Sequence, residues 1–447
     1  MAMTKVRTTT PSRRDVVRLA ATAVAAPFVA VPGRAQTSQP TLKIAKWAHF
    51  MPEYDAWFAG ELAEEWGRQH DTKVVVDHIP AERIHAAAAS EVAAGTGHDV
   101  FMFPWPPAEF QKHVIDHGEI YQTVAFKFGN IDRFSHRSTF DPKEKTYFAF
   151  ADSWIPAAFQ YFEDYWSQVG MPLGPIHYGG LRSGGRRIRE ALGVPCGLAL
   201  AAPSLQSNIT LHILLYAFRS HVLDAAGNVT IAKTALTIEA LKYAKALYED
   251  AGTPDQLAWS PSGNVQAMLA RKASATINPI SLLRAAEKEK PDVASKIRLT
   301  PPLIGHAGVF AFPHVTNCSV VWNFAQNQAG AKQFLADLID NSKTAYEKSA
   351  GCNFPTFQKT LPDLIARLDN DPQADPPRKY IELKDAAYWT RNIGFPGYAN
   401  PIAMEVFNSF VIPRMFISVI TGQSSPEDAM HVAEAEVTRI ADRWKQV

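Results

Sequence analysis

Hydrophobic and polar positions in residues 42–103 follow two periods in turn. Leu42–Trp47 alternates apolar and polar residues, which is the period of a half-buried strand. Phe58, Leu62 and Trp66 recur four residues apart and form the stripe of an amphipathic helix. We expect strands at 42–47, 73–79 and 99–103 and helices at 53–70 and 81–94, the second helix ending at Gly95. This β-α-β-α-β order predicts a mainly parallel sheet with right-handed connections.

The rest of the chain predicts a second α/β unit. The aromatic, apolar segment 151–162 follows a strand at 146–150 and is interpreted as the first crossing into a second lobe. Residues 173–185 are rich in glycine and predict a loop, and 297–302 leads back toward the first lobe. Further helices are expected at 107–117, 164–169, 208–221, 237–251, 264–270, 328–341, 403–420 and 425–445, and strands at 197–201, 273–277 and 319–322.

The N-terminus has the pattern of a bacterial export signal. Ser12-Arg13-Arg14 precedes an apolar run from Leu19 to Val31, and Gly33-Arg34-Ala35 offers small residues for cleavage after Ala35. The run is about half the roughly 20 residues that span a bilayer, which favours a removable signal over a membrane anchor. The sequence therefore predicts a twin-arginine signal peptide at residues 1–35 and a periplasmic protein.

Charge, length and cysteine usage narrow the function classes. Residues 1–35 hold six basic residues and one acid, so the remaining chain has 39 basic and 43 acidic residues and a net charge of −4. This mild acidity argues against binding nucleic acid or an anionic membrane.

The length of the chain favours two domains. The three cysteines, Cys196, Cys318 and Cys352, leave at least one thiol unpaired; we expect buried free thiols, and a Cys318–Cys352 bridge stays open.

Four segments together resemble a known family. They are Ala93-Ala94-Gly95-Thr96-Gly97-His98-Asp99-Val100, the stretch 193–199, the helix-to-loop passage 239–255, and Thr421–Ala429. In this order they resemble the extracellular solute-binding proteins of family 1, the substrate-capture subunits of bacterial ABC importers for sugars. His98 stands where the family pattern usually has Pro, which departs from it mildly.

The resemblance implies an α/β chain with the type II periplasmic-binding-protein fold. Two lobes, each a mainly parallel sheet flanked by helices, would enclose the ligand in a cleft. We expect residues 41–150 plus 300–345 in the N-terminal lobe and 151–299 plus 346–447 in the C-terminal lobe. The implied function is capture of a sugar or polyol by lobe closure and delivery to the membrane permease. It implies a monomer with no catalytic residue, no cofactor and no metal.

The residues at the expected cleft suit a sugar. Ligands of open parallel sheets lie beyond the carboxyl ends of the strands, where this chain has large aromatic residues. An aromatic ring can cover the apolar face of a sugar, while carboxylates, amides and histidines bind its hydroxyls. The candidates in the first lobe are Trp47, His49, Trp105 and Glu109. Those expected in the second lobe or in cleft loops are Asp152, Ser153, Trp154, Trp259, Asn317, Phe354 and Tyr398.

Two rival interpretations remain. An exported glycoside hydrolase is the first, since the chain has many acids, although no spacing singles out a catalytic pair. His113 and His117 lie at i and i+4 of an expected helix, a spacing that zinc can use, but the motif lacks the Glu of HExxH. The second rival keeps the two lobes and changes the cargo to an anion, a polyamine or a metal. The basic segment 182–187 is the feature closest to an anion site, and its glycines suggest a surface loop.

Overall fold

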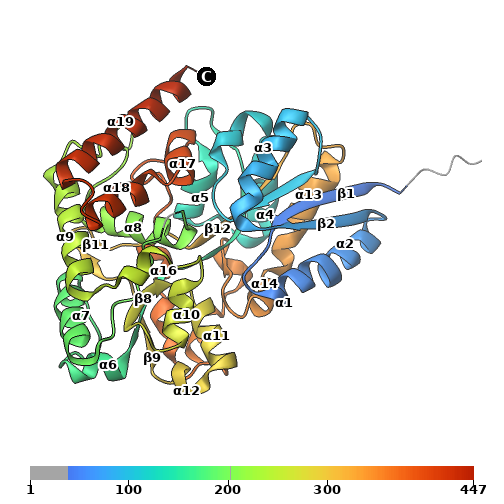
Figure 1. The fold of residues 1–447 in the computed structure, drawn as a ribbon. Coiled ribbons are helices and arrows are strands. Elements are labelled where there is room, and N and C mark those ends of the chain that lie inside the picture. Colours follow the sequence, from blue (N-terminus) through green and yellow to red (C-terminus); the bar gives the residue numbers. More distant parts are fainter. Residues whose placement is uncertain (1–38, 202, 447) are drawn as a thin grey trace, which may run out of the picture. The chain divides into compact units, whose positions relative to one another are not determined.

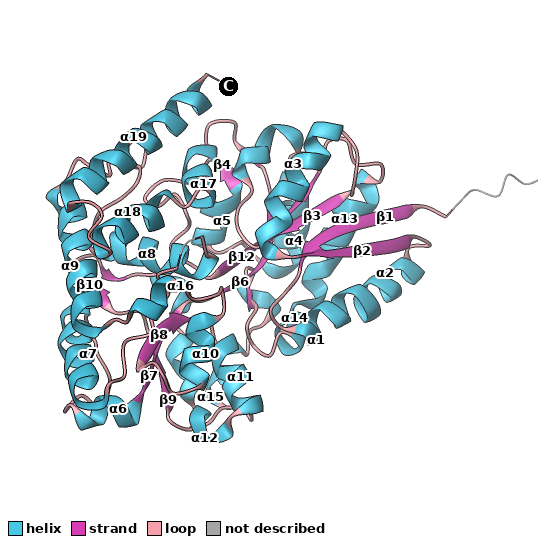
Figure 2. Ribbon diagram, in the orientation of Figure 1, coloured by secondary structure: helices cyan, strands magenta, loops and turns pink. Residues whose placement is uncertain are grey.

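The structure is a computed structural model that describes residues 39–446 except Ala202. The predicted export signal and its cleavage site after Ala35 lie outside the described residues. Residues from Gln39 onward form one compact unit in which helices surround two main sheets, and two short two-stranded sheets accompany them (Figures 1 and 2). The α/β fold class that the sequence predicts is confirmed.

The larger sheet has six strands in the order β13-β6-β12-β3-β1-β2. β1 runs parallel to both β2 and β3, as predicted, whereas β12 is antiparallel to its neighbours β3 and β6. The sheet is therefore mixed, and its parallel part is the region where the sequence repeats strand and helix. The strands are β1 Thr41–Trp47, β2 Lys73–Ile79, β3 Val100–Phe103, β6 Phe150–Ile155, β12 Val315–Val321 and β13 Phe354–Pro355.

Helices cover both faces of this sheet. On one face the predicted helix 53–70 forms as α1 (Pro52–Trp57), a π turn (Phe58–Leu62) and α2 (Ala63–Gln69). Phe58 and Trp66 of its apolar stripe meet Phe334 of α13 (Gln328–Leu338) edge to face, at ring distances of 5.9 and 5.3 Å. α3 (Ile84–Ala94) packs on the other face and ends at Gly95, which has φ +63° and closes the helix in the left-handed region, as predicted.

The smaller sheet has three strands and only antiparallel pairs. Its central strand β7 (Ala158–Phe162) pairs with β8 (Ala275–Asn278) and β9 (Ile297–Thr300). Pro156 and Ala157 separate β6 of the large sheet from β7 of the small one, so the chain passes between the sheets there. The sequence placed that crossing from residue 151 onward, but β6 continues the large sheet through Ile155. The expected return at 297–302 also differs, because β9 stays in the small sheet.

The glycine-rich segment 173–185 is mostly helical, against expectation. α7 spans Tyr178–Leu192 and starts with the His177 side chain, which accepts a hydrogen bond from the backbone N–H of Gly180. A Cβ on Gly184 would lie 2.4 Å from Cζ3 of Trp166, and one on Gly185 would lie 2.7 Å from Sγ of Cys196. These glycines allow close packing rather than a loop, and the basic residues 182–187 lie on a helix.

Residues 107–117 do not form the expected helix. A 3-10 helix spans Ala108–His113, and α4 (Gly118–Phe128) begins where the sequence predicted a helix end. The Asp116 carboxylate accepts the backbone N–H of Gly118, a local turn that competes with a continuous helix. His117 is fully buried: its Nδ1 donates to the Tyr147 carbonyl at 3.0 Å and its Nε2 accepts from the backbone of Val321 at 3.0 Å. His113 and His117 therefore do not lie on one face of a common helix.

The remaining helices surround the small sheet or connect it to the large one. The predicted helix 403–420 is broken into α17 (Pro401–Asn408) and α18 (Val411–Ile420) because Phe410 has φ +55°. α19 (Pro426–Lys445) is capped by Ser425, whose hydroxyl accepts the Asp428 N–H at 3.0 Å. Residues 197–201 form no strand. The other helices are α5 Arg133–Thr139, α6 Glu163–Gln168, α8 Leu205–Ala217, α9 Ala235–Ala251, α10 Gly263–Leu269, α11 Ser281–Glu289, α12 Pro291–Ala294, α14 Ser342–Lys348, α15 Leu364–Asp369 and α16 Ala386–Trp389, and the two-residue strands are β4 Phe140–Asp141, β5 Thr146–Tyr147, β10 Ile304–Gly305 and β11 Gly308–Val309.

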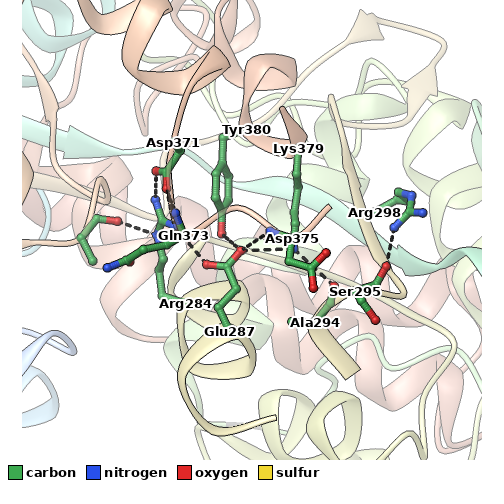
Figure 3. Close-up of polar contacts among 11 residues, drawn as sticks. Arg284, Glu287, Ala294, Ser295, Arg298, Asp371, Gln373, Asp375, Lys379 and Tyr380 are labelled. Atoms are coloured by element: carbon green, nitrogen blue, oxygen red, sulfur yellow. Dashed lines mark hydrogen bonds and ion pairs between the residues drawn. The ribbon is translucent and has the colours of Figure 1, made fainter. Parts of the chain in front are cut away.

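A buried ion cluster ties irregular chain to α11 (Figure 3). Arg284 pairs with Glu287 and Asp371, and its guanidinium lies 4.2 Å from the centre of the Tyr380 ring. Glu287 also pairs with Lys379 at 3.2 Å and accepts the Tyr380 hydroxyl at 2.8 Å. Two positive and two negative side chains balance one another, so side-chain contacts hold the irregular segment 371–378 and the short 3-10 helix that follows it, Lys379–Leu383.

Within the part of the chain that the structure describes, no helix alone has the length and apolarity to cross a membrane. α17 and α18 reach that threshold only when taken together, and they are bent by 43°.

Candidate functional site

A chain of polar side chains crosses the large sheet near the carboxyl end of β1. The indole Nε1 of Trp47 donates to Asn317 Oδ1 at 2.9 Å, and Asn317 Nδ2 donates to Ser153 Oγ at 2.9 Å. The Ser153 hydroxyl in turn donates to Asp152 Oδ2 at 2.6 Å. Four sequence candidates, Trp47, Asn317, Ser153 and Asp152, thus form one hydrogen-bonded array, which we call the polar chain.

The polar chain ends in a buried acid. Burial raises the pKa of Asp152 to about 7, an effect that outweighs the Ser153 hydrogen bond and the charge of Lys46. Its second oxygen, Oδ1, is buried and has no hydrogen-bond partner among the described residues. Asp152 is expected in the second lobe, but it lies on β6 of the large sheet.

His49 lies beside the polar chain and is held neutral. Its Nδ1 accepts the backbone N–H of Met51 at 3.0 Å, so the ring proton is on Nε2, which donates to Asn353 Oδ1 at 3.1 Å. Burial and the nearby Lys46 charge lower its pKa to about 3. The amide nitrogen of Asn353 is buried and, within the described chain, has no partner.

A second group of polar side chains joins the large sheet to α17. Trp105 Nε1 donates to Asn408 Oδ1 at 2.9 Å, and Asn408 Nδ2 donates to Glu109 Oε1 at 2.9 Å. The same carboxylate oxygen lies 2.6 Å from Nδ1 of His85. His85 also stacks on the Trp105 indole, with ring centres 5.1 Å apart and planes at 11°. We call His85, Trp105, Glu109 and Asn408 the Asn408 cluster.

The Asn408 cluster joins side chains next to the large sheet to a side chain of α17, which is connected to the small sheet. His85 is on α3, and Trp105 and Glu109 follow β3 of the large sheet. Asn408 ends α17, which is fixed to α8 where Asn208 Nδ2 donates to the Phe407 carbonyl at 2.8 Å. α8 in turn bonds the small sheet, since Gln206 Nε2 donates to the Ile277 carbonyl at 2.6 Å.

The Asn408 cluster also contains unmatched hydrogen-bonding atoms. His85 Nε2 and Glu109 Oε2 are buried and have no partner in the chain from Gln39 onward that the structure describes. Buried polar atoms are nearly always hydrogen-bonded in proteins, so a bound molecule could supply the partners that these two atoms lack.

The other sequence candidates belong to neither of these two groups. Trp154 is 3% exposed and packs edge to face between Phe134 and Phe354, at ring distances of 4.6 and 5.4 Å. Trp259 is partly exposed and packs against Gly263 in α10. Tyr398 is partly exposed and lies over the Arg137 guanidinium at 5.3 Å.

Three polar residues that bond these groups were not among the candidates predicted from the sequence. His85, Asn353 and Asn408 each bond a predicted residue. His85 lies inside an alanine-rich helix, and Asn408 is about 300 positions from Trp105 in the chain. Asn353 stands in a Gly/Pro-rich loop that drew attention only through Phe354.

The described residues contain no group of three or more His, Cys, Asp or Glu side chains arranged to hold a metal ion. Cys196, Cys318 and Cys352 are all buried free thiols, and burial raises the thiol pKa of each.

Comparisons with known proteins identify the fold. No protein-family model and no curated protein sequence matches the chain. Among solved structures, it is similar to a sugar transporter from Arthrobacter chlorophenolicus A6 with bound laminaribiose, at a TM-score of 0.74 and 14% identity, covering 89% of this chain and 99% of that one. An ABC transporter solute-binding protein from Thermotoga lettingae TMO, bound with α-D-tagatose, gives a TM-score of 0.73 and 15% identity over 90% and 99% of the two chains.

A putative oligosaccharide periplasmic-binding protein from Synechococcus sp. MITs9220 gives a TM-score of 0.74 and 18% identity over 90% of this chain and all of that one. The chain therefore has the fold of the periplasmic solute-binding proteins, as the sequence resemblance implies.

Proposed function

We propose that the chain is the periplasmic solute-binding component of an ABC importer and that it captures a sugar or polyol without changing it. The observation that carries this proposal is the Asn408 cluster, in which side chains from the large sheet and from α17 converge and leave two buried polar atoms unmatched. The structural neighbours support it, since those proteins are described with laminaribiose, tagatose and ribitol.

Lobe closure is the proposed mechanism. The proposed lobes start from the sequence-based division into 41–150 plus 300–345 and 151–299 plus 346–447. The first crossing is moved to Pro156–Ala157, and β9 and β13 go with the small and the large sheet, respectively. A ligand that contacts both lobes favours the closed form by the difference in its affinity for the two forms. The closed form is then the one that a membrane permease recognises. Export by the twin-arginine route and a monomeric state complete the proposal.

The polar chain and the Asn408 cluster have different proposed roles in ligand binding. Trp47, Asp152 and Asn317 of the polar chain form a floor at the carboxyl edge of the large sheet, and His49, bonded to Asn353, lies beside them. Trp105 and Glu109 face α17 and would contact the ligand as the lobes close. Trp154 and Phe354, packed against each other, support this floor. Trp259 and Tyr398 remain proposed contacts at the rim.

A ligand panel tests the proposal. The purified chain is screened with laminaribiose, maltose, tagatose and ribitol by thermal shift, and each hit is followed by small-angle scattering. We expect a saturable rise in melting temperature with an intact sugar, together with a smaller radius of gyration. Sugar turnover that is lost on Glu109→Gln would instead support the glycoside hydrolase. Saturable binding without compaction would contradict the closure mechanism.

A further inference from the structure

We infer that His85 and Glu109 form a ligand-binding pair that takes hydroxyl or ammonium groups and disfavours acidic ligands. This inference rests on the proposed function and specifies the chemistry of its cargo. Figure 1 labels α3 and α17, two of the elements involved, in the upper half of the described unit.

The positions of the protons follow from the contacts. A carboxylate only accepts hydrogen bonds, so the 2.6 Å contact between His85 Nδ1 and Glu109 Oε1 places a proton on Nδ1. Glu109 Oε1 also accepts Asn408 Nδ2–H at 2.9 Å, which leaves Oε2 as the free acceptor of that carboxylate. In a neutral His85 ring, Nε2 is then a second free acceptor.

Both charge states of His85 lead to the same class of ligand. With a neutral ring, the pair carries one negative charge and presents two acceptors, which two hydroxyl groups or one ammonium group can satisfy. With a protonated ring, the pair is neutral and presents one donor and one acceptor, and a single hydroxyl group can fill both roles. Neither state gives the pair a net positive charge.

An acidic group is disfavoured at this position. The carboxylate of a uronate offers only acceptor oxygens at neutral pH, and a sugar phosphate is mostly ionised there, so the charged oxygens of either group would face the Glu109 carboxylate. Like charges at close range repel most strongly where water is scarce, as at these two buried atoms. The side chains of His85 and Glu109 keep 20% and 15% exposure through their other atoms, so the pair lies close to solvent.

The ring contacts keep His85 in place for this role. Its imidazole is stacked on Trp105, whose indole is fixed by Asn408, and lies 5.2 Å from the Phe103 ring. A ring held between two aromatic side chains loses little further freedom when a ligand binds, so its hydrogen bond is favoured.

The experiment measures affinity by calorimetry for matched sets of probes. The sets are glucose, galactose and mannose, each with its uronate, 6-phosphate and 2-amino counterparts, together with laminaribiose and maltose. We expect neutral and amino sugars to bind at least tenfold more tightly than their acidic counterparts. We expect Glu109→Gln and His85→Asn each to weaken the tightest neutral sugar by about tenfold to a hundredfold, the usual cost of a lost hydrogen bond to a charged or buried partner.

Controls separate the two proposals. Glu144→Gln and His431→Ala, both at exposed positions, should leave affinity unchanged, and unchanged melting temperatures confirm that the site variants fold. An acidic sugar that binds most tightly within its set, or unaltered affinity in both site variants, would overturn this inference while the carrier function stands. Absence of binding to any of these sugars would overturn the carrier function itself.

Discussion

Single residues of the polar chain are placed so that protonation matters. Asp152 accepts one hydrogen bond from Ser153 and keeps Oδ1 unmatched within the described structure. Since burial raises its pKa from 3.8 to about 7, the folded protein binds this proton more tightly than the unfolded chain does. The stabilising contribution of the protonated acid is complete below pH 4 and declines as the pH rises toward 7.

Asp152→Asn should remove this dependence. We expect the free energy of unfolding of the variant, relative to the parent, to improve between pH 4 and pH 7 by on the order of 2 kcal/mol and then to level off. Urea unfolding across this pH range provides the measurement, with the exposed Asp385→Asn as control. A relative stability that stays flat with pH would show that the carboxyl is ionised throughout.

At the scale of elements, α7 shows how packing overrides composition. Its glycines suggested a loop, but Gly184 lies against Trp166 and Met171, where a side chain has no room. A Cβ at Gly184 would lie 2.4 Å from the Trp166 ring and 2.8 Å from Met171 Sδ. Close approach of α6 and α7 therefore depends on this residue.

Gly184→Ala should destabilise the fold by about 1–3 kcal/mol, the usual cost of overpacking, despite the better helix propensity of alanine. Gly60→Ala is the matched control, because no described atom outside its own segment lies within 4 Å of a Cβ built there. Thermal and urea unfolding of both variants make the comparison. Equal stability of the two variants would mean that α6 can shift without cost.

The sequence predicted the elements of residues 41–103 because each one has a single clear period and a terminating residue such as Gly95. It was wrong at 107–117, where Asp116 forms a local turn with Gly118, and at 403–420, which breaks at Phe410. Within the polar chain, Trp47 could be predicted because it ends β1. Asp152, Ser153 and Asn317 lie inside β6 and β12, although the sequence selected them as residues of a crossing segment or of a cleft loop. Asn408 could not, because only the tertiary fold brings α17 to Trp105.

At the scale of the whole molecule, Asn408 connects the layers around the two sheets. Its amide satisfies Trp105 and Glu109 at once, from a helix that is bonded to α8. In the proposed mechanism, opening of the lobes exchanges these two hydrogen bonds for bonds to water. The residue therefore contributes to the balance between open and closed forms.

Asn408→Ala should shift that balance toward the open form. We expect a larger radius of gyration without ligand and an affinity for the bound sugar about tenfold weaker, since a hydrogen bond contributes a net of about 1 kcal/mol. Scattering and calorimetry measure the two effects, and the exposed Asn323→Ala should change neither. An unaltered scattering profile in Asn408→Ala would contradict a role in closure.

The three buried thiols can report on local opening of the fold. Cys318 lies on β12 of the large sheet, Cys352 just before β13, and Cys196 beside β8, where Ser274 contacts it. Each sulfur is inaccessible and, with a raised pKa, poorly nucleophilic in the folded state. Alkylation by an electrophilic dye would therefore mark transient exposure, and mass mapping of the three sites would reveal which layer loosens first.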